Sequence, residues 1–408
     1  MDTLVVDVGS SSTKAGWGGE DSPSFVFPTL QGDARSKYPR YTESAEEYLG
    51  GELLANAKVA KQYKGVLEAM GQENPHPLLR GSVKNWDHME KFWKSVLEEI
   101  NIASQADSTN VLLVESPKTT VADRREWAEI IFDAYRAPSL AIGNSSSCAM
   151  FAAGRTTGVV VDCGAGLTSC VPVFEGLALT HAVVMSDYGG QDLTSLVRKN
   201  LGDRYGKHLE MADALTVKER YARVLLEAPR PPAPRSPKVT PAAHLSKTPT
   251  ASSQLVALPD GTEVSVSGDF FTECTETLLV SSSLPSGGLI NQVHESLSLC
   301  DESIRRDLCN NIIIAGGTAM MAGLGDRLGS ELERLSTADA AVKGYVPMGI
   351  RVMPSMAHKE SGYTHQRKHA AWIGGSIMSS LESFRDLKIT RQEWEEGSGE
   401  QALLTKSF

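Results

Sequence analysis

Two stretches of the chain share one pattern: Leu4-Val5-Val6-Asp7-Val8-Gly9-Ser10-Ser11-Ser12-Thr13-Lys14 and Gly158-Val159-Val160-Val161-Asp162-Cys163-Gly164-Ala165-Gly166-Leu167-Thr168-Ser169. In each stretch an apolar run rich in β-branched residues ends in Asp, one further residue and Gly, and a small polar turn follows. Apolar runs bounded in this way predict buried strands joined by tight turns. Asp7 and Asp162 are 155 residues apart, so the repeat predicts two similar α/β domains that each contribute one loop to a shared cleft.

The residue types in these loops suit a metal-bound phosphate. Mg²⁺ keeps most of its waters, so we expect Asp7 and Asp162 to bind a metal through water. The Gly and Ser residues expose backbone N–H groups that form an anion-binding nest, and Lys14 adds a point charge. A single Gly-Ser turn is more often only a hairpin, but two copies in one chain favour a binding role. A third turn, after the apolar run 312–314, brings Gly316-Gly317 to a planar base or ribose, or simply connects a strand to a helix.

The remaining segments predict a mostly parallel α/β sheet arrangement. Residues 111–115 predict a further buried strand, and residues 123–135 predict a helix with Trp127, Ile130, Ile131 and Ala134 on one face. Three stretches are predicted to be irregular: 32–47, 229–249 and 340–366. Residues 229–249 contain 7 of the 19 prolines and no acid, which predicts a mobile, partly polyproline loop. Its PxxP spacing is more typical of a solvated loop than of a recognition motif.

Composition limits the classes of function. The chain has 408 residues, enough for two domains, and a net charge of −10, which does not suit general nucleic-acid binding. No apolar stretch reaches about 18 residues, so we expect no membrane span. Asp2 and Asp7 interrupt the apolar run near the N-terminus, which argues against a signal peptide. Six cysteines without a CxxC pair fit a reducing compartment.

Ordered motifs along the chain resemble those of actin and the actin-related proteins. These motifs are the first loop 7–16, the segment Asn85-Trp86-Asp87-His88-Met89-Glu90-Lys91, the segments 154–158, 315–318 and 372–377, and the ending Lys406-Ser407-Phe408. The resemblance extends from residue 4 to residue 408. It implies the actin fold, shared with the heat-shock chaperone and sugar-kinase ATPases: two similar α/β domains, four subdomains and a central nucleotide cleft.

The resemblance also implies a division of the chain. We expect a small-domain base (subdomain 1) at 1–31, 77–152 and 370–408, with its tip (subdomain 2) at 32–76. We expect a large-domain base (subdomain 3) at 153–188 and 287–369, with its tip (subdomain 4) at 189–286, which includes the Pro-rich loop 229–249.

The cofactors implied are ATP or ADP and a divalent metal, Mg²⁺ or Ca²⁺. Asp7 and Asp162 are the implied metal residues, acting through water. The implied phosphate contacts are Ser10, Ser11, Ser12, Lys14, Gly164, Ala165 and Gly166. The implied adenosine contacts are Gly190, Lys218, Glu219, Gly317, Thr318, Met320 and Lys368. Met321 replaces a family Tyr near the base with a thioether that still packs.

Two departures from the family pattern predict very slow or absent hydrolysis. Ser145 stands where actin has a Gln on a helix, and Ser169 stands where actin has a His. Loss of a positioning or base group typically costs about 10²–10⁴-fold in rate. Ala165 also replaces an acidic residue of the metal's water shell. The alternative is that Asn144, which has the same amide as Gln, fills the Gln role.

The assembly surfaces differ as well. The stretch at 36–47 is polar and acidic where actin has an apolar loop, and 281–288 keeps one apolar residue of the family's plug. Filament contacts rely on buried apolar anchors, so both ends are poorly suited to actin-like homopolymerisation.

We therefore expect a structural subunit of a larger cytoskeletal or motor-associated assembly, in which the nucleotide closes the cleft and stabilises the fold. The partners would be proteins, with actin or other actin-related proteins among the candidates, and neither nucleic acid nor a membrane. The expected location is the cytoplasm and cytoskeleton, with the cilium or flagellum axoneme and the nucleus as alternatives. The alternative functions are a polymerising actin-like ATPase and a subunit of a chromatin remodeller; a sugar kinase or chaperone ATPase is disfavoured by the Trp86 segment and the C-terminal ending.

Overall fold

The computed structural model describes residues 2–29, 77–227, 253–284, 287–343, 349–356 and 361–408. The expectations for the tip at 32–76, for the polar stretch 36–47 and for the Pro-rich loop 229–249 concern residues outside these ranges. In the described part of the chain, no helix is both long and apolar enough to span a bilayer.

Two mixed sheets form the centre of the molecule, and they share one topology. The first has the strand order β16-β7-β6-β1-β2-β3, and the second has the order β10-β9-β8-β14-β15, with β11 paired to β9. The strands of the first sheet are β1 (Thr3–Val8), β2 (Ser12–Trp17), β3 (Phe25–Pro28), β6 (Asn110–Glu115), β7 (Ser139–Asn144) and β16 (Ile389–Thr390). Those of the second are β8 (Gly158–Cys163), β9 (Thr168–Phe174), β10 (Leu177–Ala178), β11 (Val184–Ser186), β14 (Ile312–Ala315) and β15 (Val352–Met353).

The predicted repeat is confirmed at the level of strand pairing. β1 pairs antiparallel with β2 and parallel with β6, and β8 pairs antiparallel with β9 and parallel with β14. Asp7 lies opposite Val114 in the first sheet, and Asp162 lies opposite Ala315 in the second. Both carboxylates therefore lie at the carboxyl ends of parallel strands, where α/β sheets usually bind ligands.

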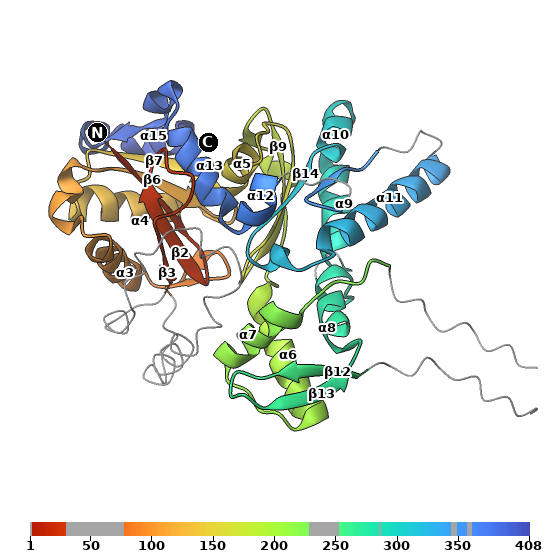
Figure 1. The fold of residues 1–408 in the computed structure, drawn as a ribbon. Helices are drawn as coiled ribbons and strands as arrows, with labels where there is room; N and C mark the ends of the chain where they lie inside the picture. The colour runs from red at the N-terminus through yellow and green to blue at the C-terminus, as the bar shows by residue number, and fades with distance from the viewer. Residues whose placement is uncertain (1, 30–76, 228–252, 285–286, 344–348, 357–360) are drawn as a thin grey trace, which may run out of the picture.

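Two helices, α5 (Ser145–Ala152) and α13 (Ala370–Ser379), pack between the sheets (Figure 1). Cys148 and Trp372 pack against the first sheet, and Ala149 and Met150 pack against the second. The helices cross without a side chain between them, because a Cβ on Gly374 would lie 1.7 Å from the Cys148 carbonyl oxygen. This close crossing joins the two halves of the molecule.

The outer faces of the sheets are covered by separate helices. The first sheet is covered by α3 (Trp86–Glu99) and α4 (Val121–Ala128), with Phe92, Trp93 and Trp127 in one apolar cluster. The second is covered by α9 (Leu289–Leu299), α10 (Glu302–Cys309) and α11 (Leu324–Lys343). A third apolar cluster lies in the tip built by α6 (Gly190–Tyr205), α7 (Met211–Tyr221), α8 (Phe270–Leu279), β12 (Ser253–Ala257) and β13 (Glu263–Ser267).

The predicted helical face at 123–135 was wrong at its end. Trp127, Ile130 and Ile131 are buried, but Ala134 is exposed and Phe132 is buried in its place. The cause is a π-helical turn at Glu129–Ala134, which follows α4 directly. A π turn carries more residues than an α turn, so it moves the next buried position along the chain.

The predicted loop-rich stretch at 340–366 contains more regular structure than expected. Its first residues extend α11 to Lys343, and it also contains β15 and α12 (Ser361–Gln366). The parallel pairing of Ile312 with Val352 explains β15, since it completes the second sheet beside β14. Such long-range pairing leaves little local signal in the sequence.

The C-terminal residues return to the first sheet. After α14 (Arg391–Glu395) and α15 (Gly399–Thr405), the Phe408 N–H donates to the Ile142 carbonyl at 3.2 Å. Both chain ends therefore lie on the same half of the molecule (Figure 1). All six cysteines are buried and free.

Candidate functional site

The two aspartates that end the central strands belong to one electrostatic cluster. Lys14 Nζ lies 3.1 Å from Asp7 Oδ2, and both side chains are mostly buried. Burial, and then the negative charge of Asp7, raise the pKa of the Asp162 carboxyl to about 6, while the positive charge of Lys14 lowers it. Two carboxylates and one ammonium from opposite sheets thus share one site.

The two glycine- and serine-containing loops meet beside this cluster. A Cβ on Gly166 would lie 3.2 Å from Ser10 Cβ, so the loops approach each other closely. The Gly81 N–H donates to Ser10 Oγ at 3.3 Å, which brings a third segment to the same place. Within the first loop, the Ser11 carbonyl accepts from the Thr29 N–H and the Ser12 carbonyl accepts from the Gly9 N–H, at 3.1 and 3.2 Å.

The second loop is tied to the start of α6 and to the turn after β14. The Gly164 carbonyl accepts from the Gly190 N–H at 3.0 Å and from Thr318 Oγ1 at 2.8 Å. The Ala165 carbonyl accepts from the Gln191 N–H at 2.8 Å. Three of the predicted contact segments therefore form one bonded unit.

Lys218 and its neighbours lie next to this unit. Lys218 is buried and donates to the Gly190 carbonyl at 3.0 Å, and burial lowers the pKa of its ammonium. Burial raises the pKa of the Glu219 carboxyl, while the positive charges of Lys218 and Lys368 lower it. Burial lowers the pKa of the Lys368 ammonium, Glu219 raises it, and the charge of Lys14 lowers it further.

The turn after β14 leaves room above its backbone. Gly316 has φ +91°, and a Cβ there would lie 2.3 Å from an oxygen of Asp162, so only glycine fits. A Cβ on Gly317 would meet no atom within 4 Å. The 3₁₀ turn Thr318–Met320 follows, and Met321 packs against the core of the second sheet. Space over Gly317 suits a flat ligand group.

One polar group in this region was not predicted from the sequence. His369 Nδ1 is buried and has no hydrogen-bond partner within the described ranges. Burial, with the charges of Lys14 and Lys368, lowers the pKa of His369 to about 3, so the imidazole is neutral. No residue pattern distinguished this histidine, because its surroundings come from distant segments.

The chemistry of these groups decides whether they fit a metal and a nucleotide. The described residues contain no group of three or more His, Cys, Asp or Glu side chains that could hold a metal directly. Two neighbouring carboxylates suit a hard cation that keeps most of its hydration, as Mg²⁺ does. The lysines, the small-residue loops and the unpartnered His369 nitrogen supply polar groups for an anionic ligand, so the residues fit a metal-bound nucleotide.

The residues at the altered positions have local structural roles. Ser145 is the first residue of α5 and is buried, and Ser169 lies opposite Asp162 in the β8–β9 pair. The Asn144 side chain caps α5, because its Oδ1 accepts from the Ser146 and Ser147 N–H groups at 2.9 and 3.4 Å. The amide oxygen of Asn144 is therefore engaged in ending β7 and starting the helix.

The ion pairs that join the two halves of the site were also not predicted from the sequence. Arg80 forms a bidentate pair with Asp192, and Lys118 Nζ lies 2.6 Å from Asp187 Oδ1. The partners are 112 and 69 residues apart in sequence, so no local pattern pointed to them.

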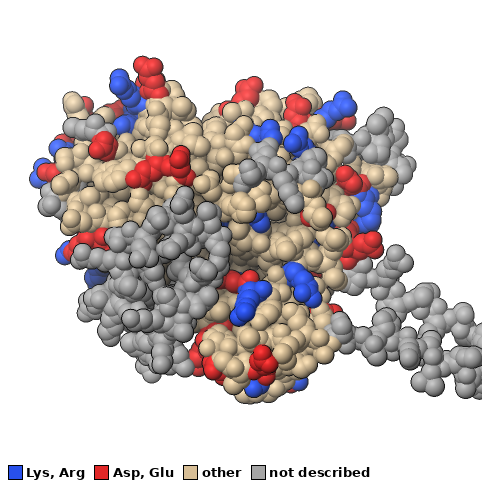
Figure 2. Space-filling view, in the orientation of Figure 1, with Lys and Arg blue, Asp and Glu red and all other residues tan. Residues whose placement is uncertain are grey.

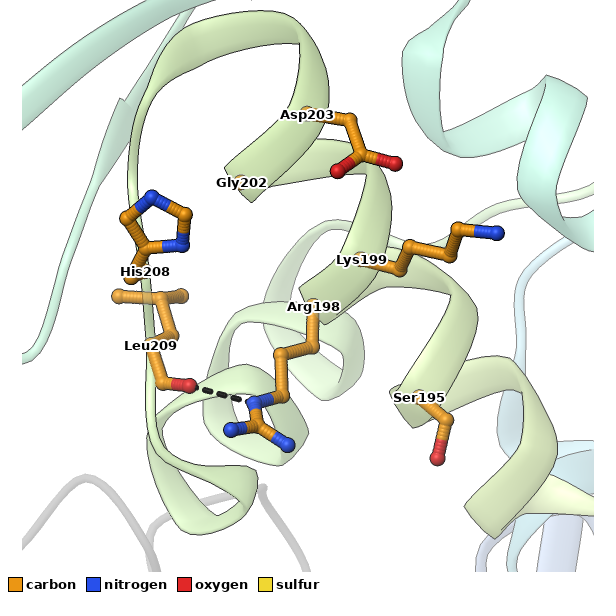
Figure 3. A pocket seen from close by; sticks show the side chains of 7 residues that line it. All are labelled: Ser195, Arg198, Lys199, Gly202, Asp203, His208 and Leu209. Atoms are coloured by element: carbon orange, nitrogen blue, oxygen red, sulfur yellow. Dashed lines mark hydrogen bonds between the residues drawn. The ribbon is translucent and has the colours of Figure 1, made fainter.

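A separate pocket lies on the tip, away from these loops. It is a pocket of about 220 Å³ lined by Ser195, Arg198, Lys199, Gly202, Asp203, His208 and Leu209. Figure 3 shows Arg198 pointing at the Leu209 carbonyl, to which its Nε donates at 2.6 Å. Arg198 thus joins α6 to the segment that precedes α7, which explains its position without a ligand.

The charged surface gives no competing site on the side shown in Figure 2. Over the described residues, basic and acidic side chains are intermixed, without a continuous basic area on that face. The repeated loops therefore remain the candidate site.

The family model described as Actin matches residues 1–223 and 199–407. The two matched stretches overlap and together span nearly the whole chain, including both repeated loops.

Proposed function

The chain belongs to the actin family, and from this membership and the geometry of the site we propose that it binds ATP or ADP with Mg²⁺ or Ca²⁺ between its two domains. The observation that carries the proposal is the meeting of Asp7, Lys14 and Asp162 from two sheets of the same topology. Two neighbouring carboxylates at buried strand ends cost folding free energy, because burial and mutual repulsion both disfavour their charged forms. A role in binding a cation explains why they are brought together.

Each part of the site has a proposed role. Asp7 and Asp162 orient the water shell of the metal, which neutralises phosphate charge when it is bound. Lys14 and the loops at Ser10–Ser12 and 164–166 bind the phosphates. The adenosine lies over Gly317, among the segments that carry the remaining proposed contacts: Gly190, Lys218, Glu219, Thr318, Met320 and Lys368.

We propose that hydrolysis is slow or absent. Serine hydroxyls at positions 145 and 169 are short and weakly basic, so they position and deprotonate water poorly. The capping role of Asn144 argues against its acting as a substitute for glutamine, because its amide oxygen already accepts two N–H groups. The nucleotide then serves as a stabilising ligand, worth about 4 kcal/mol of folding stability when it is present at 1,000 times its Kd.

A structural subunit of a cytoskeletal or motor-associated protein assembly is the role that fits this chemistry. Among the described residues of the plug region, Ser281, Ser282 and Ser283 precede a single apolar residue, Leu284. A mostly polar plug gives little of the buried apolar contact that a filament of identical copies needs.

The nucleotide proposal is tested by isothermal titration of the purified chain with Mg·ADP and Mg·ATP. Lys14→Met should weaken binding by about tenfold or more, because it removes a charge from the phosphate site. Lys199→Met is the matched control, since Lys199 lies in the pocket on the tip. Equal affinity of the native chain and the Lys14→Met chain would refute the assignment.

Hydrolysis and assembly need separate measurements. Single-turnover release of γ-phosphate should be about 10²–10⁴-fold slower than in a family member with Gln and His. Affinity purification with an N-terminal tag should recover a fixed set of other proteins at equal stoichiometry. Recovery of copies of this chain alone, together with pelleting in Mg·ATP, would favour a polymerising ATPase instead.

A further inference from the structure

The two domains are joined by ion pairs at the phosphate end of the proposed cleft. Arg80 Nη2 donates to Asp192 Oδ1 at 2.8 Å, and Arg80 Nη1 donates to Asp192 Oδ2 at 2.9 Å. Two parallel N–H···O bonds of this kind combine charge with a fixed geometry. Arg80 Nη1 also contacts the carbonyls of Asp187 and Gly166, the latter at 3.4 Å.

The backbone that carries Arg80 is itself constrained. Arg80 and Gly81 form the two-residue turn between β4 (Leu78–Leu79) and β5 (Ser82–Val83), with φ values of 51° and 73°. A positive φ in a residue other than glycine costs about 1 kcal/mol or more, and surrounding contacts must offset it. The hydrogen bonds of the Arg80 side chain and of the Gly81 N–H supply such contacts.

On the other side, Asp192 is tied to the second loop. Its Oδ2 accepts from the Gly189 N–H at 2.8 Å, so the carboxylate also caps the start of α6. The Gly190 and Gln191 N–H groups donate to the Gly164 and Ala165 carbonyls of the second loop. A displacement of Asp192 at the start of α6 would therefore also displace this loop. On the first side, the Gly81 N–H reaches Ser10 in the first loop.

Lys118 supports the same junction from the turn before α4. Its ammonium pairs with Asp187 at 2.6 Å, while Arg80 contacts the carbonyl of that same residue. The side chains of Arg80 and Asp192 are 34% and 22% exposed, whereas those of Lys118 and Asp187 are 31% and 56% exposed. The Arg80 pair is the better shielded from water, so it is expected to contribute more.

We propose that Arg80 is a positioning residue whose pair with Asp192, supported by Lys118 and Asp187, forms a clasp that keeps the two domains closed and sets the rate at which bound adenine nucleotide leaves. The inference rests on the proposed nucleotide site. Opening the domains at this end separates Arg80 from Asp192, which breaks both hydrogen bonds of the pair. The clasp touches no predicted adenosine contact other than through the backbone at Gly190, so it acts on release more than on recognition.

The test measures the release of 1,N⁶-etheno-ATP from the full chain in Mg²⁺, chased with excess ATP. Arg80→Gln should release the probe about tenfold faster, because it removes the charge and the bidentate geometry. Arg80→Lys should give an intermediate rate, and Lys118→Gln about a twofold increase. Raising the salt concentration should speed release more from the native chain than from Arg80→Gln, since salt screens the partly exposed pair.

Two further variants isolate the pair. Arg204→Gln is the matched control, because it removes the Arg204–Glu273 pair at 2.6 Å, whose two residues both belong to the tip. It should release the probe at the native rate. Asp192→Asn keeps an amide oxygen for the Gly189 N–H, and the double variant Arg80→Gln with Asp192→Asn should be no faster than Arg80→Gln alone. Native release from Arg80→Gln, or additive effects in the double variant, would overturn the inference.

Hydrogen exchange of the chain without nucleotide separates this inference from the proposed function. Arg80→Gln should raise exchange at residues 78–83 and 187–193 together and leave the rest of the chain unchanged. If the native chain fails to bind the probe yet Arg80→Gln shows this paired increase, the clasp stands and the nucleotide proposal falls. Unchanged exchange at both segments, or a uniform rise over the whole chain, would count against the clasp.

Discussion

The crossing of α5 and α13 gives a sharp prediction, because Gly374 leaves no room for a side chain. Its added Cβ would lie 1.7 Å from the Cys148 carbonyl oxygen and 2.3 Å from the carbonyl carbon. Ordinary carbon–oxygen contacts are about 3.3–3.6 Å. Gly374→Ala therefore requires the two helices to separate by about 1.5 Å, and both helices are packed between sheets.

The size of the effect follows from two opposing terms. Overpacking of a well-packed core costs about 1–3 kcal/mol and occasionally more, and this contact lies at the upper end because backbone atoms cannot rotate away. Replacing glycine by alanine inside a helix returns about 1 kcal/mol. We expect Gly374→Ala to lower the free energy of unfolding by about 2 kcal/mol or more.

Gly329→Ala in α11 is the matched control for this measurement. Its Cβ would meet Val352 at 3.6 Å, which is an ordinary contact, so the variant should gain about 0.5–1 kcal/mol. Thermal and urea unfolding of the three chains, at one scan rate and without nucleotide, measure the difference. If Gly374→Ala is as stable as Gly329→Ala, the reasoning about the helix crossing is wrong.

Three further predictions concern buried charge and titration. His369 has a pKa of about 3 in the folded chain against 6.5 for the free side chain. The neutral imidazole therefore contributes to folding stability above pH 6.5, and this contribution is lost as the pH falls toward 3. In urea unfolding, the native chain should lose about 2 kcal/mol more stability than His369→Gln between pH 7.5 and pH 5. The Asp162 pKa of about 6 lies above the ordinary 3.8, so its share of stability falls as the pH rises from 4 to 6. Mg·ADP binding, measured by titration calorimetry, should strengthen over that same range as the carboxylate ionises, and Asp162→Asn should bind more weakly and lose this part of the pH dependence. Arg327 is fully buried between Glu276 and Glu331, so Arg327→Met should lower stability by about 3–5 kcal/mol in urea unfolding, because it removes the cation paired with Glu276 and one of the two cations paired with Glu331, which keeps Arg334. A loss under about 1 kcal/mol would contradict this account.

The central strands and their aspartates could be predicted because their signals are local. An apolar run ending in Asp-x-Gly specifies a strand end wherever it occurs, and its recurrence predicted the second sheet. The parallel partners β6 and β14 follow from the same logic, since their apolar runs also end in turns.

The remaining features depend on partners that are distant in sequence. Arg80 was indistinguishable from a surface arginine, because its carboxylate partner is 112 residues away. The π turn that exposes Ala134 breaks the regular period on which helical predictions rely. The low pKa of His369 comes first from burial and then from the charge of Lys14, which lies near the other end of the chain, with the adjacent Lys368 adding to it.

Asn144 illustrates a different limit. Its side chain type was compatible with two roles, one in catalysis and one in capping a helix. The structure assigns the capping contacts, which follow from its position between β7 and α5. A variant such as Asn144→Ala would therefore reduce stability by about 1 kcal/mol, and a loss of activity in it would not identify a catalytic group.

The burial of every cysteine has a practical consequence for spectroscopy. Cys163 and Cys274 lie in different parts of the large domain, and burial raises the pKa of both thiols, as it does for the other four. Maleimide dyes react with exposed thiolates, so the native chain offers a nearly unreactive background. Cysteines introduced at the exposed positions Lys94 on α3 and Ser195 on α6 would carry a donor and an acceptor dye on opposite domains. Energy transfer between them would then follow domain opening in single molecules, with all six native cysteines left in place.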